Sequence, residues 1–169
     1  DHVIFEGDEI STANGKPYSV FSPFRNNWIK KIENKKFILK NLKQQNNKGN
    51  LETNLINPRD FGFNNVDLRK KNILPGSTGG ESELKNFLRV INNYSDNRDF
   101  PNLSANSRLS VHLRFGTLSI RDLVNKCLEI NTNSSNKWLN ELVWRDFYSS
   151  ILFNYPHVEK QEFNQKYQN

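Results

Sequence analysis

Cysteine and histidine are scarce in this chain of 169 residues, and their scarcity excludes several kinds of site. The single cysteine, Cys127, rules out an intramolecular disulfide and a zinc site of four thiolates, and it fits a reducing compartment. Cys127 also falls on an apolar helical stripe, which favours a buried thiol over a reactive one. The histidines, His2, His112 and His157, lie far apart without the spacing of zinc ligands, so we expect no metal site.

Methionine and long hydrophobic runs are both absent. No run approaches the roughly 18 apolar residues of a membrane-spanning helix, and no signal-peptide pattern opens the chain. These absences predict a cytoplasmic protein with no membrane partner. Because the chain starts at Asp1 and contains no methionine, we also expect it to be a piece of a longer protein.

Positive charge, by contrast, is in excess. The formal net charge is +6 and the sequence pI is about 9.4. This balance favours polyanionic partners such as DNA, RNA or nucleotide phosphates over acidic proteins. Net charge bears on association and not on fold, so the fold has to be predicted from the residue pattern.

The first 42 residues carry the pattern of a short β-hairpin and a helix. Residues 3–5 and 18–21 suit short strands, and residues 13–17 between them have the composition of a turn. Serine and proline at 22–23 are typical of a helix start, and Trp28 marks the apolar face of that helix.

Residues 43–78 have no regular apolar pattern. Glutamine, asparagine, glycine and lysine dominate, and Pro58 and Pro75 interrupt any helix or strand. A stretch of this length without its own structure is uncommon inside a compact domain, so we predict an interdomain linker.

The second half of the chain is predicted to be helical. One helix begins near Glu81, a shorter one covers residues 107–113, and a third starts at a capping box on Ser119. After a loop at 131–136, a further helix contains residues 138–148. The apolar stripes of the first and third helices are Leu84, Phe87, Leu88 and Ile91, and Ile120, Leu123, Val124, Cys127 and Leu128.

The helix at 138–148 has two different faces. One is an apolar stripe with a period of four residues, and the other gathers three aromatics, a carboxylate and a guanidinium within an arc of about 120°. Charges are seldom buried without a partner, so the second face suits a ligand. The spacing equally allows an intrahelical ion pair beside ordinary aromatic packing, and the residues alone leave both interpretations open. The apolar stripe is Leu139, Val143, Phe147 and Ile151, and the second face is Trp138, Glu141, Trp144, Arg145 and Tyr148.

Residues 106–110, Asn-Ser-Arg-Leu-Ser, form a second candidate site. They place small polar side chains at a helix start, where free backbone N–H groups and the helix dipole favour an anion. Tyr94 and Arg98, together with Arg108, would add a phenol and positive charge around the same phosphate. A plain helix cap remains the alternative interpretation of this segment.

These segments together resemble the DNA photolyase and cryptochrome family in order and spacing. The chain looks most similar to a bacterial photolyase that repairs cyclobutane pyrimidine dimers. The resemblance runs through nearly the whole chain. The segments that carry it are residues 18–24 with Trp28, Gly79-Gly80-Glu81, Tyr94 with residues 98–101, and residues 107–110, 115–121 and 138–148.

The resemblance implies a mainly α fold, in which this chain holds the start of an all-helical FAD-binding domain. Residues 1–42 would be the end of an α/β antenna domain and a connecting helix, residues 43–78 the interdomain linker, and residues 79–169 the first helices of the FAD-binding domain. The full-length protein would bind FAD and an antenna chromophore, either a folate or a deazaflavin.

The resemblance also implies which residues bind the cofactor. One group of positions matches the surroundings of the flavin phosphates and ribityl chain, and Trp138 matches a position that lines the flavin pocket. Asn106 stands where the family more usually has threonine. The expected cofactor-binding residues are Tyr94, Asn106, Ser107, Arg108, Leu109, Ser110, Trp138 and Arg145.

For the substrate, the resemblance implies a thymine dimer flipped out of ultraviolet-damaged DNA. Glu141 would hydrogen-bond a thymine edge, Trp144 would pack on the lesion, and Arg145 would contribute to lesion binding. Electron transfer from reduced FAD would then split the dimer, with Glu141 as the catalytic residue that stabilises the dimer radical anion. A monomer is expected.

The family's later segments, which complete the flavin cage, do not occur in these 169 residues. We therefore expect the chain alone to bind FAD weakly and not to repair DNA. Two other functions stay open at this point: a cryptochrome that signals in blue light, and a helical nucleic-acid-binding module without catalysis.

Overall fold

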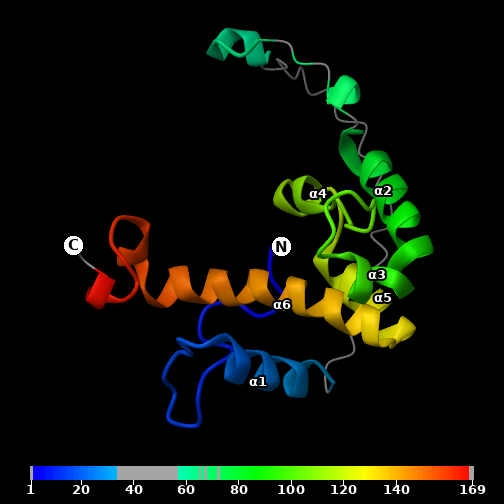
Figure 1. The fold of residues 1–169 in the computed structure, drawn as a ribbon. Helices are drawn as coiled ribbons and strands as arrows, with labels where there is room; N and C mark the ends of the chain where they lie inside the picture. Colours follow the sequence, from blue (N-terminus) through cyan, green and yellow to red (C-terminus); the bar gives the residue numbers. More distant parts are fainter. Residues whose placement is uncertain (1, 34–56, 65, 67, 72, 168–169) are drawn as a thin grey trace, which may run out of the picture.

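The computed structural model describes residues 2–33, 57–64, 66, 68–71 and 73–167 (Figure 1). Every regular element in these residues is a helix and none is a strand, which confirms the mainly α fold. The α-helices are α1 (Phe21–Glu33), α2 (Gly76–Val90), α3 (Tyr94–Asn97), α4 (Ser110–Arg114), α5 (Ile120–Ile130) and α6 (Asn133–Asn154). The 3-10 helices are η1 (Pro58–Phe61), η2 (Leu68–Lys71), η3 (Ile91–Asn93), η4 (Pro156–Glu159) and η5 (Gln165–Tyr167).

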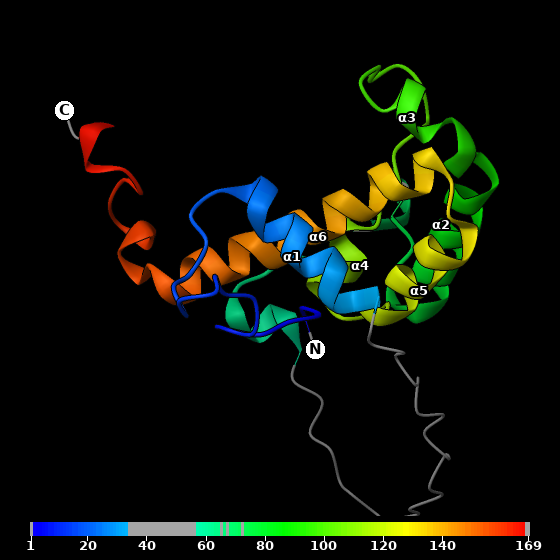
Figure 2. The ribbon, with the colours of Figure 1, turned by 90° about the horizontal axis from the view of Figure 1, so that it is seen from below.

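The 22-residue helix α6 is the axis on which the other elements pack. Helix α1 lies along one side of it, and α3 and α5 pack on its N-terminal half (Figures 1 and 2). The start of α6 is fixed by a capping box, in which Thr132 Oγ1 accepts a hydrogen bond from Ser135 N and Ser135 Oγ accepts one from Thr132 N. The loop predicted at residues 131–136 is therefore shorter than expected.

One hydrophobic core joins the N-terminal segment to the helices. The stripe predicted on α6 is confirmed, since Leu139, Val143 and Phe147 are buried and Ile151 packs against the same core. Cys127 is fully buried there, and its burial raises the pKa of the thiol to about 12. The prediction of an unreactive core thiol agrees with this environment.

The hairpin predicted in the first 21 residues is wrong. The β pairing of the described residues amounts to one antiparallel bridge between Ser11 and Pro17. Residues 3–5 instead direct two backbone N–H groups at the side chain of Asp146 on α6, and residue 21 already belongs to α1. A buried carboxylate supplies the acceptors that a neighbouring strand would otherwise supply.

The helix boundaries agree with the sequence to different degrees. Helix α5 starts after Ser119 as predicted, and Ser119 Oγ accepts a hydrogen bond from Asp122 N at 3.5 Å. Helix α2 begins five residues before the predicted start at Glu81, and α4 begins three residues after the predicted start at 107. Residues 43–56, 65, 67 and 72 of the predicted linker lie outside the described residues, and its described part contains η1, η2 and the first turn of α2.

Two other expectations concern membranes and metals. Among the described residues, no helix is both long enough and apolar enough to cross a bilayer. In the same residues, no three metal-ligating side chains gather into a group that could hold an ion.

Candidate functional site

The candidate lesion residues lie on the less buried side of α6. Glu141, Trp144 and Arg145 are half-buried and Tyr148 is exposed, whereas the stripe on the opposite side is packed in the core. The helical period that predicted a two-faced helix thus separates a core face from a partly accessible one. Trp138, one turn nearer the N-terminus, is the exception, because it is buried.

Glu141 forms an ion pair with Arg98 at the end of α3. Arg98 Nη1 lies 2.5 Å from Glu141 Oε1, and this hydrogen bond is the main reason why the pKa of Arg98 is raised. The guanidinium also lies 5.4 Å from the centre of the Tyr94 ring. Arg98, which the sequence placed beside a phosphate, instead holds the carboxylate, and the alternative of an intrahelical pair between Glu141 and Arg145 is wrong.

Trp144 is held by aromatic neighbours. Its ring stacks on Phe21 of α1 with ring centres 3.6 Å apart and planes 4° apart. Tyr148 lies 5.4 Å away at 25°, and Phe147 meets the indole edge to face. One face of the indole is therefore covered by α1, and the part that is still exposed is what a ligand could touch.

Arg145 links α6 to α4 and to the N-terminal segment. Its Nη2 donates a hydrogen bond to Leu113 O at 3.1 Å and lies 3.1 Å from His2 Nδ1. Nη1 is buried, and it has no hydrogen-bond partner among the described residues. Desolvation by burial lowers the pKa of Arg145, Asp146 opposes this effect, and Arg114 adds to it. A buried guanidinium N–H without an acceptor carries a desolvation cost, so Nη1 is free to donate a hydrogen bond.

The segment predicted to hold a phosphate leads into α4. Leu109 is the N-cap residue and is buried in the core, while Asn106, Arg108 and Ser110 are exposed and Ser107 is half-buried. The backbone of Arg108 is left-handed, with φ at 55°. Arg108 and Ser110 line a cavity of about 310 Å³ that Glu83 and His112 also line.

Tyr94 and Trp138 belong to the core around Phe87. Both rings are buried, and their centres lie 5.6 Å and 4.8 Å from that of Phe87. Desolvation raises the pKa of the Tyr94 phenol, which Arg98 partly opposes. Because both side chains are buried, a cofactor could contact either of them only where the ring reaches the boundary of the core.

The predicted residues thus fall into three neighbourhoods. Helix α4 has Ser110 at its start and the contact with Arg145 near its end, so the candidate cofactor residues 107–110 and Arg145 surround one short helix. Glu141 lies beside Arg98 and Tyr94, and Trp144 lies against α1.

Sequence reasoning missed Asp146. Its carboxylate is 1% exposed and accepts hydrogen bonds from the backbone N–H groups of Ile4 and Phe5 and from Trp28 Nε1 at 2.8 Å. Burial raises its pKa to about 6, although the Trp28 and backbone hydrogen bonds oppose the shift. The spacing contained a signal, since Asp146 stands three residues after Val143 and therefore on the core side of α6.

Comparisons with known proteins place this geometry in context. No protein-family model matches the chain. It is 30% identical to the deoxyribodipyrimidine photo-lyase of Alkalihalophilus pseudofirmus over 99% of the chain and 36% of the relative, and 28% identical to that of Escherichia coli over 95% of the chain and 35% of the relative. The chain is similar over nearly its whole length to one part of the deoxyribodipyrimidine photo-lyases. The resemblance predicted from the sequence is confirmed.

Further matches agree with this relationship. The mitochondrial photo-lyase of Saccharomyces cerevisiae is 28% identical over 88% of the chain and 30% of its own length. A solved class III photolyase from Agrobacterium tumefaciens has the same fold, with a TM-score of 0.74 at 21% identity over 98% of the chain and 36% of that structure. The chain thus spans about a third of the length of the photo-lyases that it matches.

Proposed function

We propose that this chain is part of a light-dependent DNA repair lyase that splits cyclobutane pyrimidine dimers. The observation that carries the proposal is the arrangement of Glu141, Trp144 and Arg145 on one partly accessible face of α6. An acceptor, an aromatic ring and a cation within two helical turns match what an extruded base requires, namely a hydrogen bond, a stacking surface and a phosphate contact. The proposal includes a cytoplasmic monomer with ultraviolet-damaged DNA as its partner.

The residues around α4 fit FAD in part. Arg145 Nη1 is a buried donor without a described acceptor, and Arg108 and Ser110 bring a cation and a hydroxyl to one cavity, so both places suit phosphate or ribityl oxygens. Glu83 in the same cavity opposes an anion and would keep a phosphate near Arg108. When bound, reduced FAD supplies the electron that splits the dimer.

Within this proposal, Arg98 has a positioning role. It donates a hydrogen bond to Glu141 Oε1 and leaves Oε2 to accept a hydrogen bond from a thymine N–H. Phe21 stacks on the indole of Trp144 and holds it in one orientation. The exposed part of the ring can then pack on the lesion without first changing its rotamer. Arg145, fixed by Leu113 O, lies one turn beyond Glu141 and can meet a phosphate of the cofactor or of the DNA.

The test is a chimaera in which this chain replaces the matching 35% of the Escherichia coli photo-lyase. We expect blue light to drive repair of a dimer-containing oligonucleotide, and Glu141→Gln to slow repair by about tenfold, equivalent to ~1.4 kcal/mol in the barrier. Glu129→Gln, an exposed change on α5, is the matched control and leaves the rate unchanged. Flavin absorption and circular dichroism confirm that each protein is loaded and folded.

The same assay separates the rival functions. A loaded and folded chimaera that fails to repair dimers would contradict the proposal and favour blue-light signalling. Repair that is equally fast with Glu141→Gln would contradict the role of Glu141 while leaving the lyase activity intact.

A further inference from the structure

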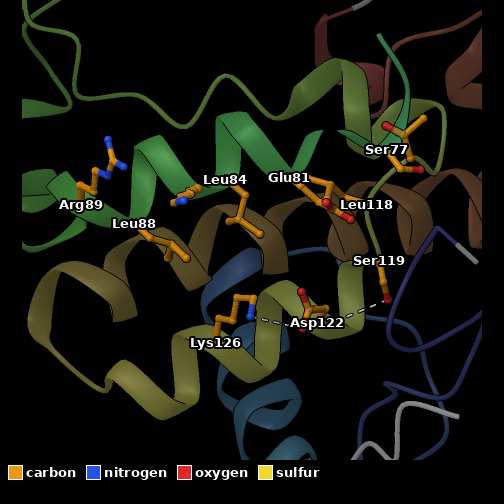
Figure 3. Close-up of a pocket in the computed structure, with 11 residues that line it drawn as sticks. Ser77, Glu81, Leu84, Leu88, Arg89, Leu118, Ser119, Asp122 and Lys126 are labelled. Atoms are coloured by element: carbon orange, nitrogen blue, oxygen red, sulfur yellow. Dashed lines mark hydrogen bonds and ion pairs between the residues drawn. The ribbon is translucent and has the colours of Figure 1, made fainter. Parts of the chain in front are cut away.

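A groove separate from the site on α6 lies between α2 and the beginning of α5. Its volume is about 700 Å³, and its lining includes none of Glu141, Trp144 and Arg145. Helix α2 packs on α4 and η3, whereas α5 packs on α6, so the sides of α2 and α5 that face each other leave a channel between them (Figure 3). The groove is therefore a consequence of how the two helices are anchored.

Leucines form the floor of this groove. Leu84 and Leu88 come from α2, and Leu118 comes from the segment before α5 (Figure 3). Leu84 is 6% exposed, while Leu88 and Leu118 are half-buried and keep apolar surface open to the channel. Such a floor suits aliphatic side chains, because they gain by leaving water.

Charged side chains line the two rims. On α5, Asp122 and Lys126 neutralise each other in an ion pair of 3.6 Å. On α2, Glu81, Lys85 and Arg89 are exposed and form no ion pair with a described residue. The α2 rim thus offers two cations against one carboxylate, and it favours a partner with negative charge along that edge.

We propose that this groove binds an amphipathic α-helix of another polypeptide, with aliphatic residues on its inner face and acidic residues beside α2. The lining on α2 runs from Ser77 to Arg89, twelve residue steps or about 18 Å of helix, which corresponds to roughly three turns of a partner helix. Aliphatic residues at i, i+4 and i+7 of the partner cover Leu84, Leu88 and Leu118. Its carboxylates then meet Lys85 and Arg89.

Nucleic acid fits the groove less well. Its phosphates would contact Lys85 and Arg89, but its sugars and bases would leave the leucine floor without an aliphatic partner. An amphipathic helix can cover the leucine floor with its aliphatic side chains and place its carboxylates beside Lys85 and Arg89 on the α2 rim.

The experiment uses a fluorescein-labelled peptide with leucines at i, i+4 and i+7 and glutamates on one flank. Fluorescence anisotropy with this chain should give saturable binding, and a peptide with lysine in place of each glutamate should bind about tenfold more weakly. The double variant Lys85→Glu with Arg89→Glu should also bind the acidic peptide about tenfold more weakly, whereas the matched variant Lys137→Glu on α6 should bind it unchanged.

A second variant tests the apolar floor. Leu88→Ala removes aliphatic surface and should weaken binding several-fold at any salt concentration, while added salt should weaken only the charge-dependent part. Circular dichroism checks that each variant is folded. The proposal is overturned if binding does not saturate, if the groove variants bind like Lys137→Glu, or if single-stranded DNA displaces the peptide.

Discussion

At the residue scale, Glu141 depends on a neighbour from another element. Its partner Arg98 comes from the end of α3, 43 positions earlier in the chain, so helical spacing within α6 could not identify it. The side chains of Arg98 and Glu141 are 29% and 38% exposed, which places the pair near solvent. We therefore expect the ion pair to orient the Glu141 carboxylate and to add little to the free energy of unfolding.

A double-mutant cycle tests this weak coupling. We expect Arg98→Ala and Glu141→Gln to show a coupling free energy of about 0.5–1 kcal/mol in urea unfolding, because the pair is partly screened by water. Fully additive effects of the two substitutions would contradict the ion pair. The coupling should shrink at high salt.

Asp146 should make stability depend on pH. Its pKa is raised from 3.8 unfolded to about 6 folded, so between these values the unfolded chain gives up a proton that the folded chain retains. The free energy of unfolding should therefore fall as pH rises from about 4 to about 6, by on the order of 3 kcal/mol from this group alone, and stay low above that range.

The measurement compares Asp146→Asn with the unsubstituted chain by urea unfolding across this pH range. Because the amide does not titrate, the variant should gain relative stability steadily from pH 4 to pH 6. Asp8→Asn, at an exposed carboxylate, is the control and should follow the unsubstituted chain. Parallel curves for Asp146→Asn would show that the carboxylate does not hold its proton in the folded state.

At the element scale, α2 shows how tertiary contact overrides propensity. Two consecutive glycines, Gly79 and Gly80, disfavour a helix, so the sequence placed the helix start at Glu81. In the structure both glycines are inside α2 and buried. An added Cβ would lie 2.0 Å from Leu74 O at Gly79 and 2.8 Å from Leu118 Cγ at Gly80. Glycine is present because neighbouring groups come too close for any side chain.

This contact predicts that Gly79→Ala is destabilising although alanine favours helices. We expect a loss of about 2 kcal/mol or more in the free energy of unfolding, since the clash is with a backbone carbonyl that cannot rotate away. Asn86→Ala, at an exposed position of the same helix, should be neutral or slightly stabilising. A similar gain for both variants would contradict the close approach at Leu74.

Periodicity and caps explain which elements the sequence predicts well. The stripes of α5 and α6 and the cap at Ser119 follow local rules, and these features agree with the structure except at Leu128, which is 38% exposed at the edge of the α5 stripe. The hairpin failed because the acceptors for residues 3–5 come from Asp146, more than 140 positions away. Likewise, the same-helix spacing of Glu141 and Arg145 is compatible with several partners, and only the packing of α3 and α4 selects among them.

At the scale of the whole molecule, α6 carries residues that serve the core on one side and an open surface on the other. The partners of Glu141, Trp144 and Arg145 come from α3, α1 and α4 respectively, so the candidate site depends on elements spread over most of the described chain. The resemblance named these residues, but only the fold reveals that they face three different neighbourhoods.

This arrangement predicts that the chain alone binds FAD weakly. Well-formed ligand sites bury most of their ligand in roughly 300–1,000 Å³, and the cavity at Arg108 and Ser110 has only about 310 Å³ for a cofactor larger than most drugs. We expect the purified chain to be colourless, and added FAD to keep nearly all of its free fluorescence at micromolar protein. Arg145→Gln should weaken the residual binding further, because the buried Nη1 donor is lost. An absorption spectrum with stoichiometric flavin bands would contradict this prediction and would mean that these 169 residues enclose the cofactor by themselves.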